Sequence, residues 1–102
     1  MKIVLSSCPP AHVKRIASAL VEEQLAACVH ASPIRSFYRW KGALQEDEEV
    51  SLLIKAPASS IERLRERFCE LHPYELPAFV VLEVDPEASL PAFVAWVQAG
   101  GG

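Results

Sequence analysis

Residues 28–55 read CVHASPIRSFYRWKGALQEDEEVSLLIK, and this stretch predicts a long antiparallel β-hairpin in the middle of the chain. Residues 28–40 and 50–55 are rich in β-branched, aromatic and aliphatic side chains that alternate between two faces, as they do in strands. Gly42 marks a turn between the two runs. We expect residues 45–48, Gln45-Glu46-Asp47-Glu48, to form an acidic loop near the tip of this hairpin.

An amphipathic helix is predicted on each side of the hairpin. Before it, apolar residues recur at helical spacing from residue 13 to residue 25, with charged residues largely on the opposite side. After it, Ser59-Ser60-Ile61-Glu62 has the pattern of a capping box, with Ser59 as the N-cap. Residues 61–71 then carry a second apolar stripe, so a second helix is expected there.

Apolar strands at residues 2–6 and 79–84 lie outside these two helices, and residues 89–97 predict a short third helix. The order of elements is therefore β-α-β-β-α-β-α. This order predicts an α+β fold, a ferredoxin-like βαββαβ sandwich with an extra C-terminal helix. We expect residues 1–102 to form one domain, since this length suits one hydrophobic core.

The helices of such a fold cover one face of the sheet, so the other face should carry polar side chains. Instead, residues 3–5, 52–54 and 79–82 are apolar at every position. Leaving that face in water forfeits several kcal/mol, at about 25 cal/mol per Å². We expect sheets from several copies to associate in a closed oligomer. The alternative is that the last helix folds back over this face.

Composition excludes several classes of protein. The formal net charge of −3 argues against a nucleic-acid partner, which requires a basic face. No apolar run approaches the roughly 20 residues of a membrane span, and the N-terminal run is too short for a signal peptide. Three widely spaced cysteines give no disulfide framework or zinc knuckle. Reduced thiols and a cytoplasmic location are expected.

Residues 71–77, LHPYELP, form a proline-bracketed connector between the second helix and the last strand. Pro73 ends the helix and favours an extended His72. Three hypotheses for His72 remain open: it caps the helix C-terminus, it ligates copper or zinc, or it lines a small-molecule pocket with Tyr74. Cys28 and His30 share one strand face and could chelate a soft metal, or Cys28 is a buried structural residue.

The remaining polar and aromatic residues do not predict an enzyme, because no nucleophile is paired with a base. Cys8 lies near a helix N-terminus, which would lower its pKa, but it has no assignable histidine partner. Tyr38 and Trp40 share the strand face of Ile34 and are typical of packing or of an interface. Glu49 and Lys55 lie on the same face of their strand, and we expect both to reach the rim near His72.

Five motifs in order make the chain resemble the CutA family of divalent-cation tolerance proteins. They cover most of the chain and are specific only together. The motifs are Ala17-x-x-Leu20-Val21-Glu22-x-x-Leu25-Ala26-Ala27-Cys28-Val29, Ser36-x-Tyr38-x-Trp40-x-Gly42, Glu49-Val50 running to Ile54-Lys55, His72-Pro73-Tyr74-x-x-Pro77, and Trp96.

The resemblance implies a homotrimer whose sheets pack around a central axis. It also implies a pocket at the subunit boundary, onto which Cys28, Tyr38, Trp40, Glu49, Lys55, His72 and Tyr74 map. The function implied is a response to metal ions, with weak binding of copper or another divalent metal and no obligatory cofactor. The candidate metal ligands are His72 and the strand pair Cys28 and His30. Of the Cys/His/His copper set of some members, only His72 is present. A distant likeness to trimeric PII proteins implies the alternative, a small-molecule signalling or binding module that uses the inter-subunit pocket.

Overall fold

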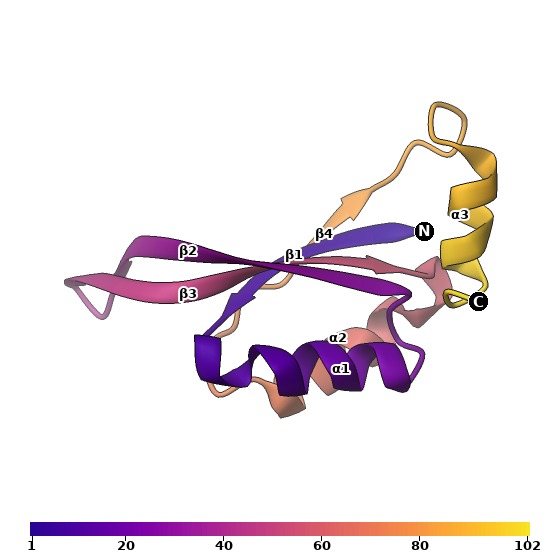
Figure 1. The fold of residues 1–102 in the computed structure, drawn as a ribbon. Helices are drawn as coiled ribbons and strands as arrows, with labels where there is room; N and C mark the ends of the chain where they lie inside the picture. The colour runs from indigo at the N-terminus through magenta and orange to yellow at the C-terminus, as the bar shows by residue number, and fades with distance from the viewer.

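A four-stranded antiparallel sheet with strand order β2-β3-β1-β4 organises the computed structural model, which describes residues 1–102 (Figure 1). Helices α1 and α2 lie side by side against one face of the sheet. This arrangement confirms the ferredoxin-like α+β fold with an extra C-terminal helix. The elements are β1 (Lys2–Cys8), α1 (Val13–Glu22), β2 (Cys28–Trp40), β3 (Ala43–Ala56), α2 (Ile61–Leu71), β4 (Val80–Glu83) and α3 (Pro91–Gln98).

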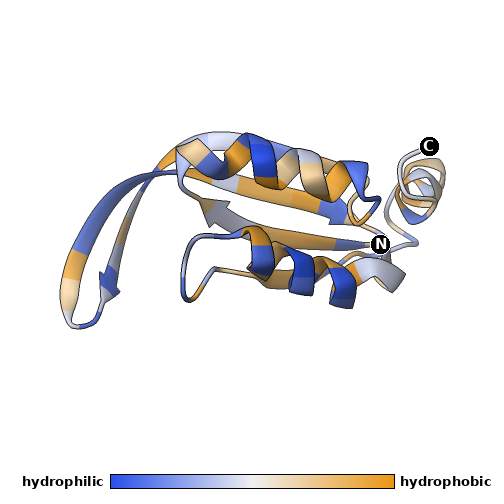
Figure 2. Cartoon of the chain, turned by 90° about the horizontal axis from the view of Figure 1, so that it is seen from below, coloured by the Kyte–Doolittle hydropathy of each residue, from blue (hydrophilic) through white to orange (hydrophobic).

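The hydrophobic core fills the space between the sheet and the two helices. Val4 of β1, Leu52 and Ile54 of β3, and the stripes of α1 and α2 are fully buried there, because alternate strand residues and every third or fourth helix residue point inward. Figure 2 shows hydrophilic residues on the outer sides of these helices and mostly apolar strands behind them. The core cluster comprises Val4, Cys8, Ile16, Leu20, Leu25, Ala26, Val50, Leu52, Ile54, Ala56, Leu64, Phe68 and Leu71.

The β2–β3 hairpin is longer than the rest of the sheet and projects beyond the helices as an arm (Figure 1). Its strands pair continuously to the tip, where Lys41 and Gly42 both have positive φ, as in the tight turns that suit hairpins. The expected acidic loop at residues 45–48 is therefore wrong, since these residues lie within β3. Arg35 on β2 explains why: its guanidinium lies 2.8 Å from Glu46 and 3.8 Å from Glu48.

The start of α2 also differs from the sequence expectation. Ser59 is not an N-cap; it lies inside a 3-10 turn at residues 58–60, closed by a bond from Ser60 N–H to the Pro57 carbonyl at 3.0 Å. Helix α2 begins at Ile61 without a side-chain cap. At the C-terminal end of α2, the expected extended conformation of His72 is confirmed. Its ψ is 136°, immediately before Pro73.

We call the sheet face turned away from α1 and α2 the open face; its apolar side chains are Ile3, Leu5, Leu53, Val80 and Leu82. Leu5, Val80 and Leu82 are 40%, 53% and 41% exposed. Helix α3 stands at one end of the sheet and does not cover this face (Figure 1). Gln98 anchors α3 there, accepting a 2.9 Å hydrogen bond from the Ala58 N–H. The alternative in which the last helix covers the open face is therefore wrong.

A helix that crosses a lipid bilayer needs about 20 predominantly apolar residues. None of them is both long enough and apolar enough to cross a membrane.

Candidate functional site

A cleft lies between the β2–β3 arm and the connector that follows α2. We call it the Glu49 cleft; its volume is about 900 Å³. The arm supplies its aromatic side chains, β1 supplies Ser7 at its C-terminal end, and the connector supplies the opposite wall. The lining residues are Ser7, Ser36, Phe37, Tyr38, Trp40, Glu49, Pro73, Tyr74, Glu75, Leu76, Pro77 and Ala78.

Two phenol–carboxylate hydrogen bonds organise this cleft. The Tyr74 hydroxyl donates to Glu49 Oε2 at 2.9 Å, and the Tyr38 hydroxyl donates to Asp47 Oδ2 at 2.6 Å. Burial, the hydrogen bond to Glu49 and the charge of Glu49 raise the pKa of Tyr74 far above its ordinary value. The hydrogen bond to Asp47, followed by burial, raises the pKa of Tyr38. Both phenols are therefore neutral donors at physiological pH.

His72 lies beneath the cleft with only 6% of its surface exposed. Its Nε2 is 2.8 Å from the Ser7 carbonyl oxygen, and its Nδ1 is 3.1 Å from the backbone nitrogen of Tyr74. Since a carbonyl accepts and a backbone N–H donates, this geometry assigns a neutral imidazole protonated at Nε2. Its ring also contacts those of Phe68 and Tyr74, at centroid distances of 5.2 and 4.8 Å. His72 thus fixes the connector against β1.

The C-terminal carbonyl of α2 is capped by another residue. Arg15 of α1 donates from Nη2 to the Leu71 carbonyl at 2.7 Å. The hypothesis that His72 caps the C-terminus of α2 is therefore wrong. Its imidazole hydrogen-bonds to the Ser7 carbonyl of β1 and not to a carbonyl of the helix. Within this chain both ring nitrogens are occupied, so neither presents a free lone pair to a metal.

Three of the predicted site residues lie away from the cleft. Lys55 pairs in register with Cys28 and Ile3, and its Nζ lies 5.2 Å from the centroid of the Phe93 ring on α3. Lys55 and Glu49 are six positions apart along β3, which is about 20 Å at roughly 3.3 Å per residue. The expectation that Glu49 and Lys55 both reach the rim near His72 is therefore wrong for a single chain. Their even spacing places them on the same face of β3, but it does not bring them close together.

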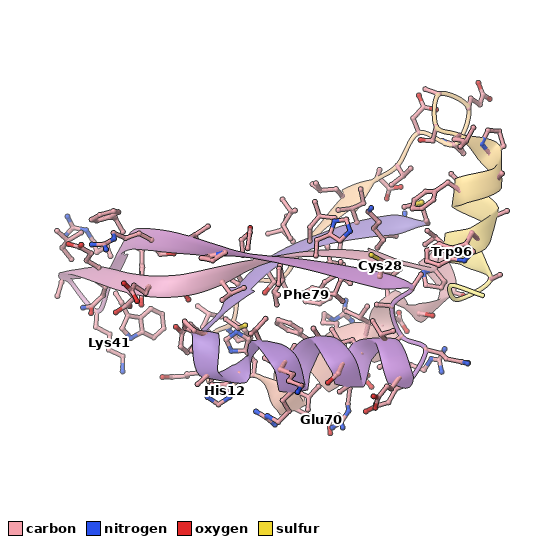
Figure 3. The ribbon with its side chains drawn as sticks, in the orientation of Figure 1. His12, Cys28, Lys41, Glu70, Phe79 and Trp96 are labelled. Atoms are coloured by element: carbon pink, nitrogen blue, oxygen red, sulfur yellow. The ribbon has the colours of Figure 1, made fainter.

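Cys28 and His30 also lie at the far end of the sheet from His72. Figure 3 shows Cys28 and Trp96 at one end of the molecule and Lys41, at the tip of the arm, at the other. Both side chains are on the open face, Cys28 half-buried and His30 exposed, about 6.6 Å apart along the strand. No three His, Cys, Asp or Glu residues are grouped so as to hold a metal ion. The residues of one chain therefore do not fit the three-ligand copper set implied by the resemblance.

Cys8 contradicts a further expectation from the sequence. It is fully buried beneath the sheet, and burial followed by the negative charge of Glu49 raises its pKa instead of lowering it. The thiol is therefore protonated at neutral pH and is a poor nucleophile.

Sequence reasoning missed the residues that shape the connector wall. Ser6 Oγ donates to the Ala78 carbonyl at 2.6 Å, which ties the connector to β1 between residues 72 positions apart in the chain. The only signal was a polar serine on the core-facing side of β1, between the buried Val4 and Cys8. Ser7 gave no signal, because a small polar residue on a strand is common on any solvated face. Ser36 begins one of the family motifs but was not assigned to the pocket.

Comparison with known proteins places this architecture in a family. The family model described as the CutA1 divalent ion tolerance protein matches residues 2–100. A divalent-cation tolerance protein CutA from Thermus thermophilus is 46% identical over 85 residues, covering 81% of this chain and 82% of that protein. Protein CutA from Mus musculus is 43% identical over 94 residues, covering 90% of this chain. The match spans only 52% of the longer mouse protein.

Solved structures agree with these sequence relationships. The apo form of a PII-like protein CutA from Nostoc superposes with a TM-score of 0.95 and 50% identity, covering 100% of this chain and 98% of the other. CutA1 from Pyrococcus horikoshii gives a TM-score of 0.90 at 31% identity, covering 100% and 99%. The family is described by tolerance of divalent ions and not by a catalysed reaction. The chain belongs to the CutA1 family of divalent ion tolerance proteins.

Proposed function

We propose that this protein acts in the response to divalent metal ions as a homotrimeric, non-enzymatic binding protein, and that the Glu49 cleft is its ligand site. One observation carries the choice of site. Glu49 lines the cleft and is 94% buried, yet its only side-chain hydrogen bond comes from Tyr74 and no basic residue pairs with it. A buried carboxylate without a counter-charge is costly to maintain, and such groups concentrate at functional sites.

The open face supports the trimer. Its exposed leucine and valine side chains form a continuous apolar surface over β1 and β4, which is typical of an interface. Membership of the CutA1 family, one of whose structures is described as PII-like, agrees with assembly. Leu5→Glu should reduce the mass measured by light scattering to that of a single 11.2 kDa chain. Val21→Glu places the same charge on an exposed apolar residue of α1 and should leave the mass at three chains.

Direct metal binding is proposed only as a weak property, at Cys28 and His30. These two side chains share the open face of β2, where neighbouring subunits of a trimer could add ligands. Calorimetry with copper should therefore give a small heat that Cys28→Ser removes and His72→Ala retains. A heat that His72→Ala abolishes in folded protein would instead assign the metal to the imidazole.

A cytoplasmic location belongs to the same proposal. It is supported by the three cysteines, all free thiols, because thiols persist in reducing compartments. Fractionation of the source cells checks it.

Native mass spectrometry tests the ligand site directly. Protein purified without denaturation should carry a bound small molecule in addition to the mass of three chains. Ser36→Trp places an indole in the cleft and should remove that extra mass while leaving the trimer intact. Arg63→Trp adds the same ring on the exposed side of α2 and should retain it. Retention of the bound molecule by both variants would contradict the Glu49 cleft as the site.

A further inference from the structure

The lining of the Glu49 cleft is aromatic and acidic. Among its 12 residues, two are glutamates, Glu49 and Glu75, and none is lysine, arginine or histidine. The four aromatic side chains are Phe37, Tyr38, Trp40 and Tyr74. The two carboxylates would repel an anionic ligand. The ammonium of Lys41 stands beside the cleft, over the Trp40 ring, and pairs with neither carboxylate.

Glu49 provides a vacant acceptor inside this cleft. Tyr74 donates to Oε2, whereas Oε1 accepts no hydrogen bond and is not fully buried by protein atoms. The nearby guanidinium of Arg35 is engaged with Glu46 and Glu48 instead. Because Glu49 is 94% buried as a residue and has no basic partner, a cation that reaches Oε1 gains a charge-assisted hydrogen bond in a site of reduced dielectric.

The aromatic rings favour the same kind of ligand. The hydroxyls of Tyr38 and Tyr74 are both committed as donors to carboxylates, so their rings are held in place as neutral π-faces. Trp40 already attracts one cation, since Lys41 Nζ lies 5.8 Å from its ring centroid. Rings of this kind attract ammonium and guanidinium groups through their quadrupoles.

We propose that the Glu49 cleft binds a small organic cation with N–H donors, an alkylammonium or a guanidinium. This inference rests on the proposed function, which makes the cleft the ligand site, and adds the chemical class of the ligand. A divalent metal fits less well, because one free carboxylate oxygen falls short of the four or more ligands that such ions take. The volume of about 900 Å³ suits a small organic molecule.

Three probes of equal chain length separate charge from shape: putrescine, 1,4-butanediol and succinate. Calorimetry on the intact wild-type protein should detect putrescine, with 1,4-butanediol at least about tenfold weaker and succinate not bound. Equal affinity for putrescine and 1,4-butanediol would overturn the cationic class, as would tighter binding of succinate.

Matched variants locate the effect. Glu49→Gln removes the charge but keeps an acceptor for the Tyr74 hydroxyl. It should lower the affinity for putrescine about tenfold and leave the affinity for 1,4-butanediol unchanged. Glu66→Gln makes the same charge change on the exposed side of α2 and should bind like wild type. Trp40 is partly exposed, so we expect the Trp40→Leu variant to fold. It should bind putrescine several-fold more weakly. Unchanged putrescine affinity in both cleft variants would overturn the inference.

The two proposals fail separately. If native spectra show a bound molecule that Ser36→Trp removes, but putrescine does not bind wild type, the cationic class is wrong and the ligand site stands. If putrescine binds and Ser36→Trp does not affect it, the cation binds elsewhere and the cationic class is wrong for this cleft. If the natively bound molecule also survives Ser36→Trp, the ligand site fails as well.

Discussion

The Tyr74 hydroxyl donates a 2.9 Å hydrogen bond to Glu49 Oε2, joining the connector after α2 to the middle of β3. The two residues are 25 positions apart, and the end of β3, the 3-10 turn at residues 58–60 and α2 separate them in the chain. Their contact closes one side of the Glu49 cleft, since both residues line it. The stability of this corner and the shape of the site therefore depend on the same bond.

Tyr74→Phe should lower the free energy of unfolding by about 1 kcal/mol, because it removes a hydrogen bond to a charged acceptor at a partly exposed position. Urea denaturation at fixed protein concentration measures the loss, since the stability of an oligomer depends on concentration. Tyr38→Phe removes the matching bond to Asp47 on the exposed arm and should cost less. A larger loss for Tyr38→Phe would contradict this ranking.

The same phenol should make stability depend on alkaline pH. The folded state raises the pKa of Tyr74 above its ordinary value of 10.0. The unfolded chain therefore loses this proton first, so the stability that Tyr74 contributes is fully present below about pH 10 and is lost as the pH rises further. Denaturation curves should show the difference between wild type and Tyr74→Phe shrinking above that pH. A difference that grows with pH would have the wrong sign.

His72→Ala should destabilise the protein by about 2–4 kcal/mol, because it removes both imidazole hydrogen bonds and leaves a gap beside Phe68. Chemical denaturation measures the effect. His72→Gln keeps one amide donor for the Ser7 carbonyl and should lose less. Equal stability of wild type and His72→Ala would contradict the structural role of this imidazole.

The three thiols should react at very different rates with Ellman's reagent. Cys69 is exposed and should be modified first, whereas Cys8 is fully buried with a raised pKa and should react only on unfolding. Absorbance at 412 nm follows the reaction, and Cys69→Ser should abolish the fast phase. Rapid modification of Cys8 in native protein would show that the core beneath the cleft opens.

Local pattern was sufficient for most of the fold. Strand β2 runs from Cys28 to Trp40, the same bounds that alternation of side chains predicted, and α2 ends at Leu71 because Pro73 follows. Residues 45–48 were misassigned because four acidic or amide side chains in a row are typical of a loop. Their strand conformation depends on partners across the hairpin, Arg35 for Glu46 and Tyr38 for Asp47.

The sequence by itself determined the order of the elements, the apolar open face and the residue types of the site, because periodicity and turn chemistry act over a few neighbouring residues. Only the tertiary structure decided which of these residues meet. In it, Tyr74 hydrogen-bonds to Glu49, and both ring nitrogens of His72 hydrogen-bond to backbone groups. Lys55, Cys28 and His30 lie at the far end of the sheet. The reason is that strand register and a connector tied by Ser6 to β1 set distances between segments that are remote in the chain.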